Sequence, residues 1–130
     1  MSQLIEGVSH LNSLELQELL EASGGETVVI DVREQEEYDA VHIPGVPLVP
    51  MSEIADLLEK FDPAREYVFV CRSGRRSLEV AKFFQANGIQ RVHNHLGGML
   101  DWQSQELEVA SGSDDQAAER LWTSLAPAAE

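Results

Sequence analysis

Hydrophobic and polar positions follow two alternating patterns along this chain. Short runs of β-branched and aromatic residues predict buried strands, and stretches with apolar residues three or four positions apart predict amphipathic helices. Strands that alternate with helices favour an α/β fold with a mainly parallel sheet and right-handed crossovers. The predicted strands cover residues 8–11, 27–30, 67–70 and 89–93, with a short one at 48–49. The predicted helices cover residues 12–22, 35–40, 50–61, 77–86, 97–102 and 115–125.

Three local signals refine this outline. The run Thr27–Ile30 has no polar face, so we expect it at the centre of the sheet. Gly24-Gly25 is expected to end the first helix. Two prolines flank a glycine within residues 42–47, which therefore predict a turn.

The chemistry gathers where the strand 67–70 meets the next helix. Cys71 directly follows the strand, and a loop of small and basic residues leads from it into the helix. Backbone amides in such a turn and at a helix start stabilise an anion, and three arginines add positive charge. The loop therefore favours a thiolate, which is the nucleophilic form of cysteine. A buried, inert cysteine is the alternative, but it would leave the cluster Arg72, Arg75 and Arg76 unexplained.

Composition makes this loop stand out. The net charge is −14, yet three of the nine Lys and Arg residues lie between positions 72 and 76. The overall charge argues against nucleic acid or an anionic membrane as a partner, whereas the basic loop suits a small anion. The single cysteine excludes an internal disulfide, and no apolar run has the length of a signal peptide or a membrane helix. We therefore expect a cytoplasmic protein.

The composition changes near the C-terminus. Residues 103–130 carry six acidic residues and one arginine. We divide the chain into a domain at 1–104 and an acidic tail at 105–130. The tail is either a docked helix or a disordered appendage, and the cost of exposing Trp122 and Leu125 to water favours the helix.

Four stretches, taken together, resemble a single-domain rhodanese. In chain order they are Asp31-Val32-Arg33 with Glu37-Tyr38, then His42-Ile43-Pro44-Gly45, then Cys71-Arg72-Ser73-Gly74-Arg75-Arg76-Ser77, then Gly97-Gly98-Met99 with Trp102. The resemblance implies a central, mainly parallel five-stranded sheet with helices on both faces. The chain departs from the family at Val41, Val46 and His95, where glycine, alanine and an apolar residue are usual.

The resemblance also implies an activity, that of a thiosulfate sulfurtransferase. Cys71 would take a sulfane sulfur from a small anionic donor such as thiosulfate and pass it from a persulfide to cyanide, a thiol or a partner protein. No cofactor and no metal are expected, and we expect a monomer. Substrate would bind at the loop residues Arg72, Ser73, Gly74, Arg75 and Arg76, with support from Asp31, Arg33, Glu37, His42 and Ser77.

The supporting residues also have structural interpretations. Arg33 and Glu37 lie four apart, a spacing that allows an ion pair between them, and we expect their role to be structural. Asp31 would accept hydrogen bonds from loop amides, pair with an arginine or cap the backbone. His42 is expected to be a hydrogen-bonded structural histidine, and His93 with His95 offers too few ligands for zinc.

Two other functions remain open. Related phosphatases and arsenate reductases have one residue more between cysteine and arginine than the four that separate Cys71 from Arg76. A tighter loop suits one sulfur atom better than a tetrahedral phosphate. A non-catalytic persulfide carrier or interaction module has the same sequence features, because fold and motif do not fix function.

Overall fold

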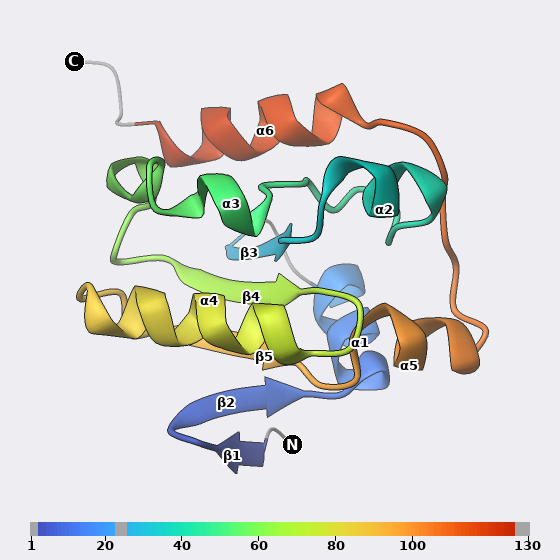
Figure 1. The fold of residues 1–130 in the computed structure, drawn as a ribbon, viewed down its shortest axis with the longest axis horizontal. Helices are drawn as coiled ribbons and strands as arrows, with labels where there is room; N and C mark the ends of the chain where they lie inside the picture. Colours follow the sequence, from blue (N-terminus) through green and yellow to red (C-terminus); the bar gives the residue numbers. More distant parts are fainter. Residues whose placement is uncertain (1–2, 23–25, 127–130) are drawn as a thin grey trace.

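The structure, a computed structural model, describes residues 3–22 and 26–126 (Figure 1). Its centre is a five-stranded sheet in the order β1-β2-β5-β4-β3. Only β1 runs antiparallel, against β2, and the other neighbours are parallel. The strands are β1 Gln3–Ile5, β2 Val8–Leu11, β3 Thr27–Asp31, β4 Glu66–Val70 and β5 Val92–His95. The helices are α1 Ser13–Ala22, α2 Gln35–Ala40, α3 Met51–Ile54, the 3₁₀ helix η1 Leu58–Lys60, α4 Arg75–Ala86, α5 Gly98–Ser104 and α6 Asp115–Leu125.

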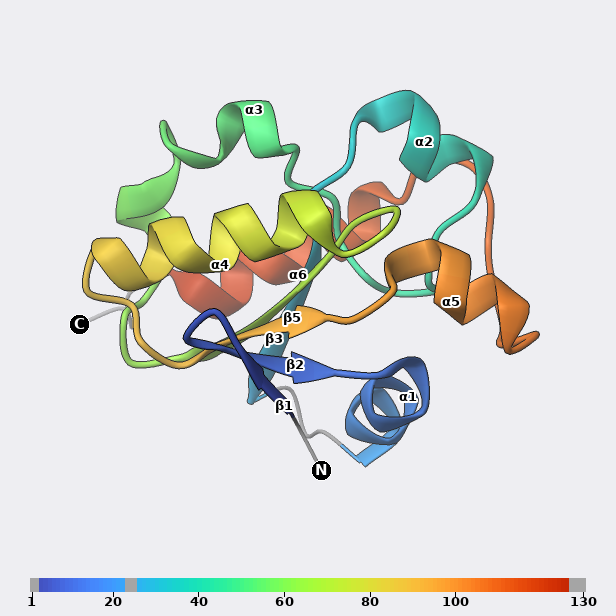
Figure 2. The same ribbon diagram turned by 60° about the horizontal axis from the view of Figure 1, so that its bottom comes forward.

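Helices cover both faces of the sheet, as the fold class requires (Figures 1 and 2). One apolar cluster joins the side chains of Ile30 and Phe69 to helices α3, α4 and α6. A second cluster, on the opposite face, joins Val29 and Val68 to α1 and α5. The predicted α/β architecture with a mainly parallel five-stranded sheet is therefore confirmed.

The segment after residue 104 packs against the same core. Asp114 caps α6 by accepting a hydrogen bond from the Ala117 amide at 2.9 Å. Leu121 and Leu125 are buried in the cluster with α4, and the Trp122 ring packs edge-on against Phe61 at 5.4 Å. Residues 115–125 thus form a helix where the sequence predicts one, and its apolar face is docked.

Strand β3 lies at the edge of the sheet, so the prediction that it is central is wrong. Its residues are apolar because helices cover both of its faces, and its C-terminal end is paired further. The Asp31 amide donates to Pro47 O and the Val49 amide donates to Asp31 O, both at 2.9 Å. An edge strand that is covered in this way has the composition of a central one.

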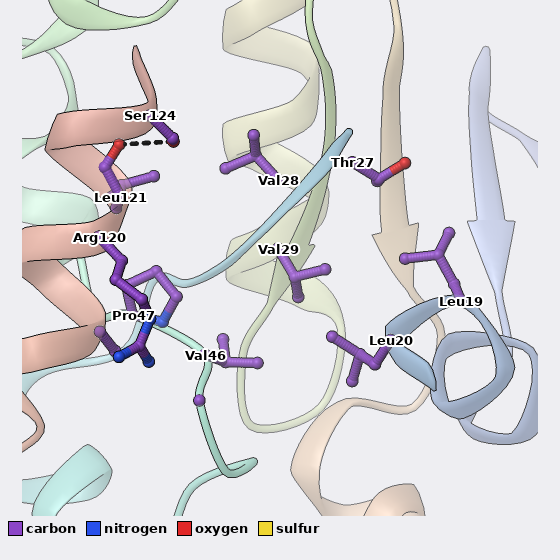
Figure 3. Close-up of a pocket in the computed structure, with 12 residues that line it drawn as sticks. Leu19, Leu20, Thr27, Val28, Val29, Val46, Pro47, Arg120, Leu121 and Ser124 are labelled. Carbon is purple, nitrogen blue, oxygen red and sulfur yellow. Dashed lines mark hydrogen bonds between the residues drawn. The ribbon is translucent and has the colours of Figure 1, made fainter. Parts of the chain in front are cut away.

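The remaining edge of β3 borders a shallow pocket of about 290 Å³. Figure 3 shows Leu20 of α1, Val29 of β3, Val46 of the turn and Leu121 of α6 around it. This pocket lies away from Cys71, which is not among its lining residues.

Several boundaries differ from the sequence prediction. Strand β5 covers 92–95 instead of 89–93, and α4 begins at Arg75, two residues early. The helix predicted at 50–61 is divided into α3 and η1, and Leu48 forms only an isolated bridge with Asp31. Gly24-Gly25 lies outside the described residues. No helix in the described part of the chain is long and apolar enough to cross a membrane.

Candidate active site

Cys71 lies directly beyond the C-terminal end of β4, and its side chain is almost completely buried. The Gly74 amide points at the Cys71 sulfur, with N···Sγ at 3.0 Å, and Ser77 Oγ lies 3.2 Å from the same atom. Gly74 has a φ of 98°, which glycine adopts without strain, and helix α4 begins at the next residue. The sulfur therefore faces an amide and a hydroxyl at a helix start, which suits an anionic sulfur.

Helix α5 fixes the opposite side of this loop. The amides of Met99 and Leu100 donate to the carbonyls of Cys71 and Arg72 at 2.9 and 3.0 Å. A Cβ on Gly98 would lie 2.5 Å from those carbonyl oxygens, so only glycine permits the approach. This contact explains Gly98, whereas a Cβ on Gly97 would lie 2.6 Å from Asp101 Cβ.

Arg76 forms an ion pair with Glu37 of α2. The two terminal guanidinium nitrogens, Nη1 and Nη2, each donate to one Glu37 carboxylate oxygen at 2.7 Å. The hydrogen bonds from Arg76 hold the pKa of Glu37 at about 2, against an ordinary value of 4.5. The Arg76 pKa is raised, mainly by the same hydrogen bonds, with a smaller contribution from nearby Cys71.

The ion pair that the spacing of Arg33 and Glu37 allows is therefore not formed. Arg33 is buried and binds Asp31 instead, with Nη2···Oδ2 at 2.7 Å and Nε within 3.1 Å of both carboxylate oxygens. Its guanidinium also donates to the carbonyl oxygens of Val41 and Glu37. The helix spacing of Arg33 and Glu37 did not decide the pairing, because Arg33 precedes α2 and its side chain turns back to the end of β3.

The three loop arginines are not equivalent. Arg72, Ser73 and Arg75 are exposed, whereas Arg76 is partly buried in its pair with Glu37. Within residues 3–22 and 26–126, the side chains of Arg72 and Arg75 form no ion pair or hydrogen bond. These two guanidinium groups are available to an anionic ligand that approaches the loop.

Asn94, which was not among the predicted site residues, links the loop to the sheet. Asn94 is buried on β5, its Nδ2 lies 3.0 Å from Gly74 O, and Ser77 Oγ donates to its Oδ1. The prediction ended the strand at residue 93 and so gave Asn94 no position facing the loop. A polar residue three positions before Gly97 was the available signal.

The histidines have structural roles in this geometry. His42 stacks on Tyr38 with ring centroids 3.8 Å apart, and its Nδ1 lies 2.9 Å from Tyr38 O. His95 is buried against Trp102 and hydrogen-bonds Ser13 at 2.7 Å, and burial lowers its pKa to about 4. No cluster of three metal-ligating side chains occurs among the residues that the structure describes.

Comparison with known proteins places these features in one family. The model of the family described as "Rhodanese-like domain" matches residues 14–105. A putative sulfurtransferase, YtwF of Bacillus subtilis, is 38% identical over 98 residues, which cover 75% of this chain and 93% of that protein.

Two further comparisons agree with this result. A putative sulfur carrier protein, YrkF of B. subtilis, is 39% identical over 74 residues, which cover 57% of this chain and 40% of that protein. The crystal structure of a rhodanese-like domain protein from Staphylococcus aureus superimposes with a TM-score of 0.68 at 36% identity, covering 78% of this chain and 98% of the other.

Proposed function

We propose that this chain, which belongs to the rhodanese-like domain family, is a sulfurtransferase that carries sulfur as a persulfide on Cys71. The observation that carries the proposal is the geometry at the sulfur atom. The Gly74 amide and the Ser77 hydroxyl both lie within hydrogen-bond distance of Sγ, at the start of α4. This environment favours a reactive thiolate and, after transfer, a charged persulfide.

The reaction divides into two displacements. In the first, the Cys71 thiolate attacks the outer sulfur of thiosulfate, the S–S bond of the donor breaks, and sulfite leaves with the bonding electron pair. In the second, cyanide or an acceptor thiolate attacks the outer sulfur of the persulfide, and Cys71 departs as a thiolate. Atoms and electrons balance over the two steps, and double displacement predicts ping-pong kinetics.

Charge supports an inorganic anion as the donor. Thiosulfate is a dianion, and Arg72 and Arg75 present two exposed guanidinium groups beside Cys71 in a chain of net charge −14. Arg76 is already paired with Glu37. Because both terminal nitrogens of Arg76 already donate to Glu37, they are not available for bidentate binding of a phosphate, which disfavours a phosphatase.

The test is direct because the chain has one cysteine. The purified protein is incubated with thiosulfate, desalted and weighed by intact mass spectrometry. We expect a mass gain of one sulfur atom that disappears on addition of cyanide, with stoichiometric release of thiocyanate. Absence of the gain in a folded protein would refute a persulfide on Cys71.

A carrier that delivers sulfur to one protein partner is the second candidate. One relative, YrkF of B. subtilis, is named as a putative sulfur carrier protein. Turnover with cyanide or small thiols separates the two functions. A persulfide that forms but resists every small acceptor would favour the carrier.

A further inference from the structure

We propose that Asn94 is a positioning residue. Its side-chain oxygen competes with the Cys71 sulfur for the hydrogen bond that the Ser77 hydroxyl donates, and so sets how readily Cys71 ionises. The inference rests on the proposed function of Cys71 as a sulfur nucleophile. It concerns a residue on the sheet that does not itself touch the sulfur.

The orientation of the Asn94 amide is fixed by its neighbours. Its Nδ2 lies 3.0 Å from Gly74 O, which only accepts hydrogen bonds, and 3.2 Å from His10 Nδ1. His10 Nε2 lies 3.3 Å from Ile5 O, so the proton of a neutral His10 belongs on Nε2 and Nδ1 accepts from Asn94. Both Asn94 amide hydrogens are thereby assigned, and its Oδ1 faces Ser77.

Ser77 has one proton and two groups that can take it. Its Oγ hydrogen-bonds Asn94 Oδ1 and lies 3.2 Å from Cys71 Sγ. When Cys71 is a thiol, Ser77 donates to Asn94 and its lone pair accepts from S–H. When Cys71 is a thiolate, the hydroxyl has to turn to the sulfur, and buried Asn94 Oδ1 then loses its donor.

This competition favours every state in which Sγ carries no charge. In the persulfide the charge is on the outer sulfur, so the Ser77 hydroxyl is free to return to Asn94. Asn94 thus stabilises the thiol and the loaded persulfide relative to the free thiolate. Its effect on the sulfur is transmitted mainly through the rotating Ser77 hydroxyl.

The charged groups around Cys71 are independent of this switch. Arg72, Arg75 and Arg76 come from the loop and the start of α4, and Glu37 of α2 pairs with Arg76. The Asp31–Arg33 pair lies at the C-terminal end of β3, and His10 lies on β2 with its Nδ1 3.2 Å from Asn94 Nδ2. Uncharged substitutions at Asn94 and Ser77 leave all these charges in place.

The experiment measures the rate of iodoacetamide alkylation of Cys71 against pH, without any sulfur donor. Asn94→Leu keeps the branched shape at Cγ and removes both polar atoms, so we expect the midpoint to move about 0.5–1 pH unit lower. Ser77→Ala removes the donor to the thiolate and moves the midpoint higher by a similar amount. In the Ser77→Ala background, Asn94→Leu shifts the midpoint much less than in wild type, because only the hold of Asn94 on Gly74 O is then left to lose.

Two further variants keep the result interpretable. Ser13→Ala deletes a buried hydroxyl of α1 that hydrogen-bonds His95, the neighbour of Asn94 on β5. It leaves the contacts of the Cys71 sulfur intact, so the midpoint stays unchanged. Asn94→Ala removes the same polar atoms without the bulk of leucine, so its midpoint also falls, and it serves if Asn94→Leu fails to fold.

Opposite results would overturn the inference. The inference is contradicted if the midpoint rises or stays constant in Asn94→Leu and Asn94→Ala. It is also contradicted if Asn94→Leu shifts the midpoint as much when residue 77 is alanine as when it is serine. Because no donor is present, these outcomes do not depend on persulfide formation. Failure of the proposed function would appear separately, as a missing mass gain with thiosulfate.

Discussion

The Cys71 loop and helix α6 are held to the same sheet by different forces. The loop is fixed by directional hydrogen bonds, from Gly74 to Sγ and from α5 to the carbonyls of Cys71 and Arg72. Helix α6 is fixed mainly by apolar contacts, through Leu121 and Leu125. Directional bonds place atoms for chemistry, whereas apolar burial supplies free energy with little directional demand. Substitutions in the loop should therefore mainly reduce sulfur transfer, and substitutions in α6 should mainly reduce the free energy of unfolding.

The largest effect should come from Cys71→Ser. Serine without a neighbouring base is a poor nucleophile, so we expect sulfur transfer to fall by at least about a thousandfold. The free energy of unfolding should change by less than about 1 kcal/mol, because the substituted atom is nearly isosteric. Thiocyanate release and urea denaturation measure the two quantities. A variant that retains measurable transfer would show that Cys71 is not the sulfur carrier.

Leu121→Ala should produce the reverse result. Removing a buried leucine side chain leaves a cavity beside α4, and we expect a loss of about 3 kcal/mol in the free energy of unfolding. Transfer per folded molecule should stay at the wild-type level, since Leu121 lines the pocket beside β3, whose lining does not include Cys71. Thr123→Ala, at an exposed position of the same helix, is the matched control. A fall in kcat/KM of fully folded Leu121→Ala would show that α6 shapes the site.

Removal of the Arg76–Glu37 ion pair should have an effect of intermediate size. The lowered pKa of Glu37, about 2 against 4.5, means that its contribution to stability is complete above pH 4.5 and is lost as pH falls towards 2. The pair is about one-third exposed, so screening limits its contribution to about 1 kcal/mol. The free energy of unfolding of wild type should exceed that of Glu37→Gln by this amount at pH 7.

Acid titration then tests the assignment. The difference between wild type and Glu37→Gln should shrink between pH 4.5 and 2, and exposed Glu36→Gln should show a much smaller difference at pH 7. A difference that persists unchanged at the lower pH would show that the carboxylate charge is not its source.

The smallest effect should come from Arg72→Ala. An exposed guanidinium contributes at most about 1 kcal/mol to anion binding, so we expect KM for thiosulfate to rise about two- to fivefold with little change in kcat. Added salt should raise KM less in this variant than in wild type. Arg120→Ala, which removes an exposed guanidinium group on α6, is the control and should leave KM unchanged. Equal KM values for wild type and Arg72→Ala at low ionic strength would remove Arg72 from donor binding.

The sequence predicted the fold and the position of the candidate nucleophile because both depend on local signals. Strand and helix periodicity identified β4 and α4, and the cluster of charge after Cys71 identified the loop. The prediction for β3 was wrong because burial by helices and by residues 47–49 makes an edge strand as apolar as a central one. Pairing of Asp31 with an arginine was one of the alternatives, but neither its partner Arg33 nor the Asn94–Ser77 contact was predicted, because each depends on where side chains turn once the strands are assembled.

The positions of the two tryptophans give each face of the sheet its own fluorescent reporter. Trp102 is buried with α1 and α5 on one face, and Trp122 packs beside Phe61 and 5.3 Å from Lys60 Nζ on the other. In Trp122→Phe the emission comes from Trp102 alone, and in Trp102→Phe from Trp122 alone. Denaturation curves from the two variants would reveal whether the two layers melt together or whether the C-terminal helix detaches first.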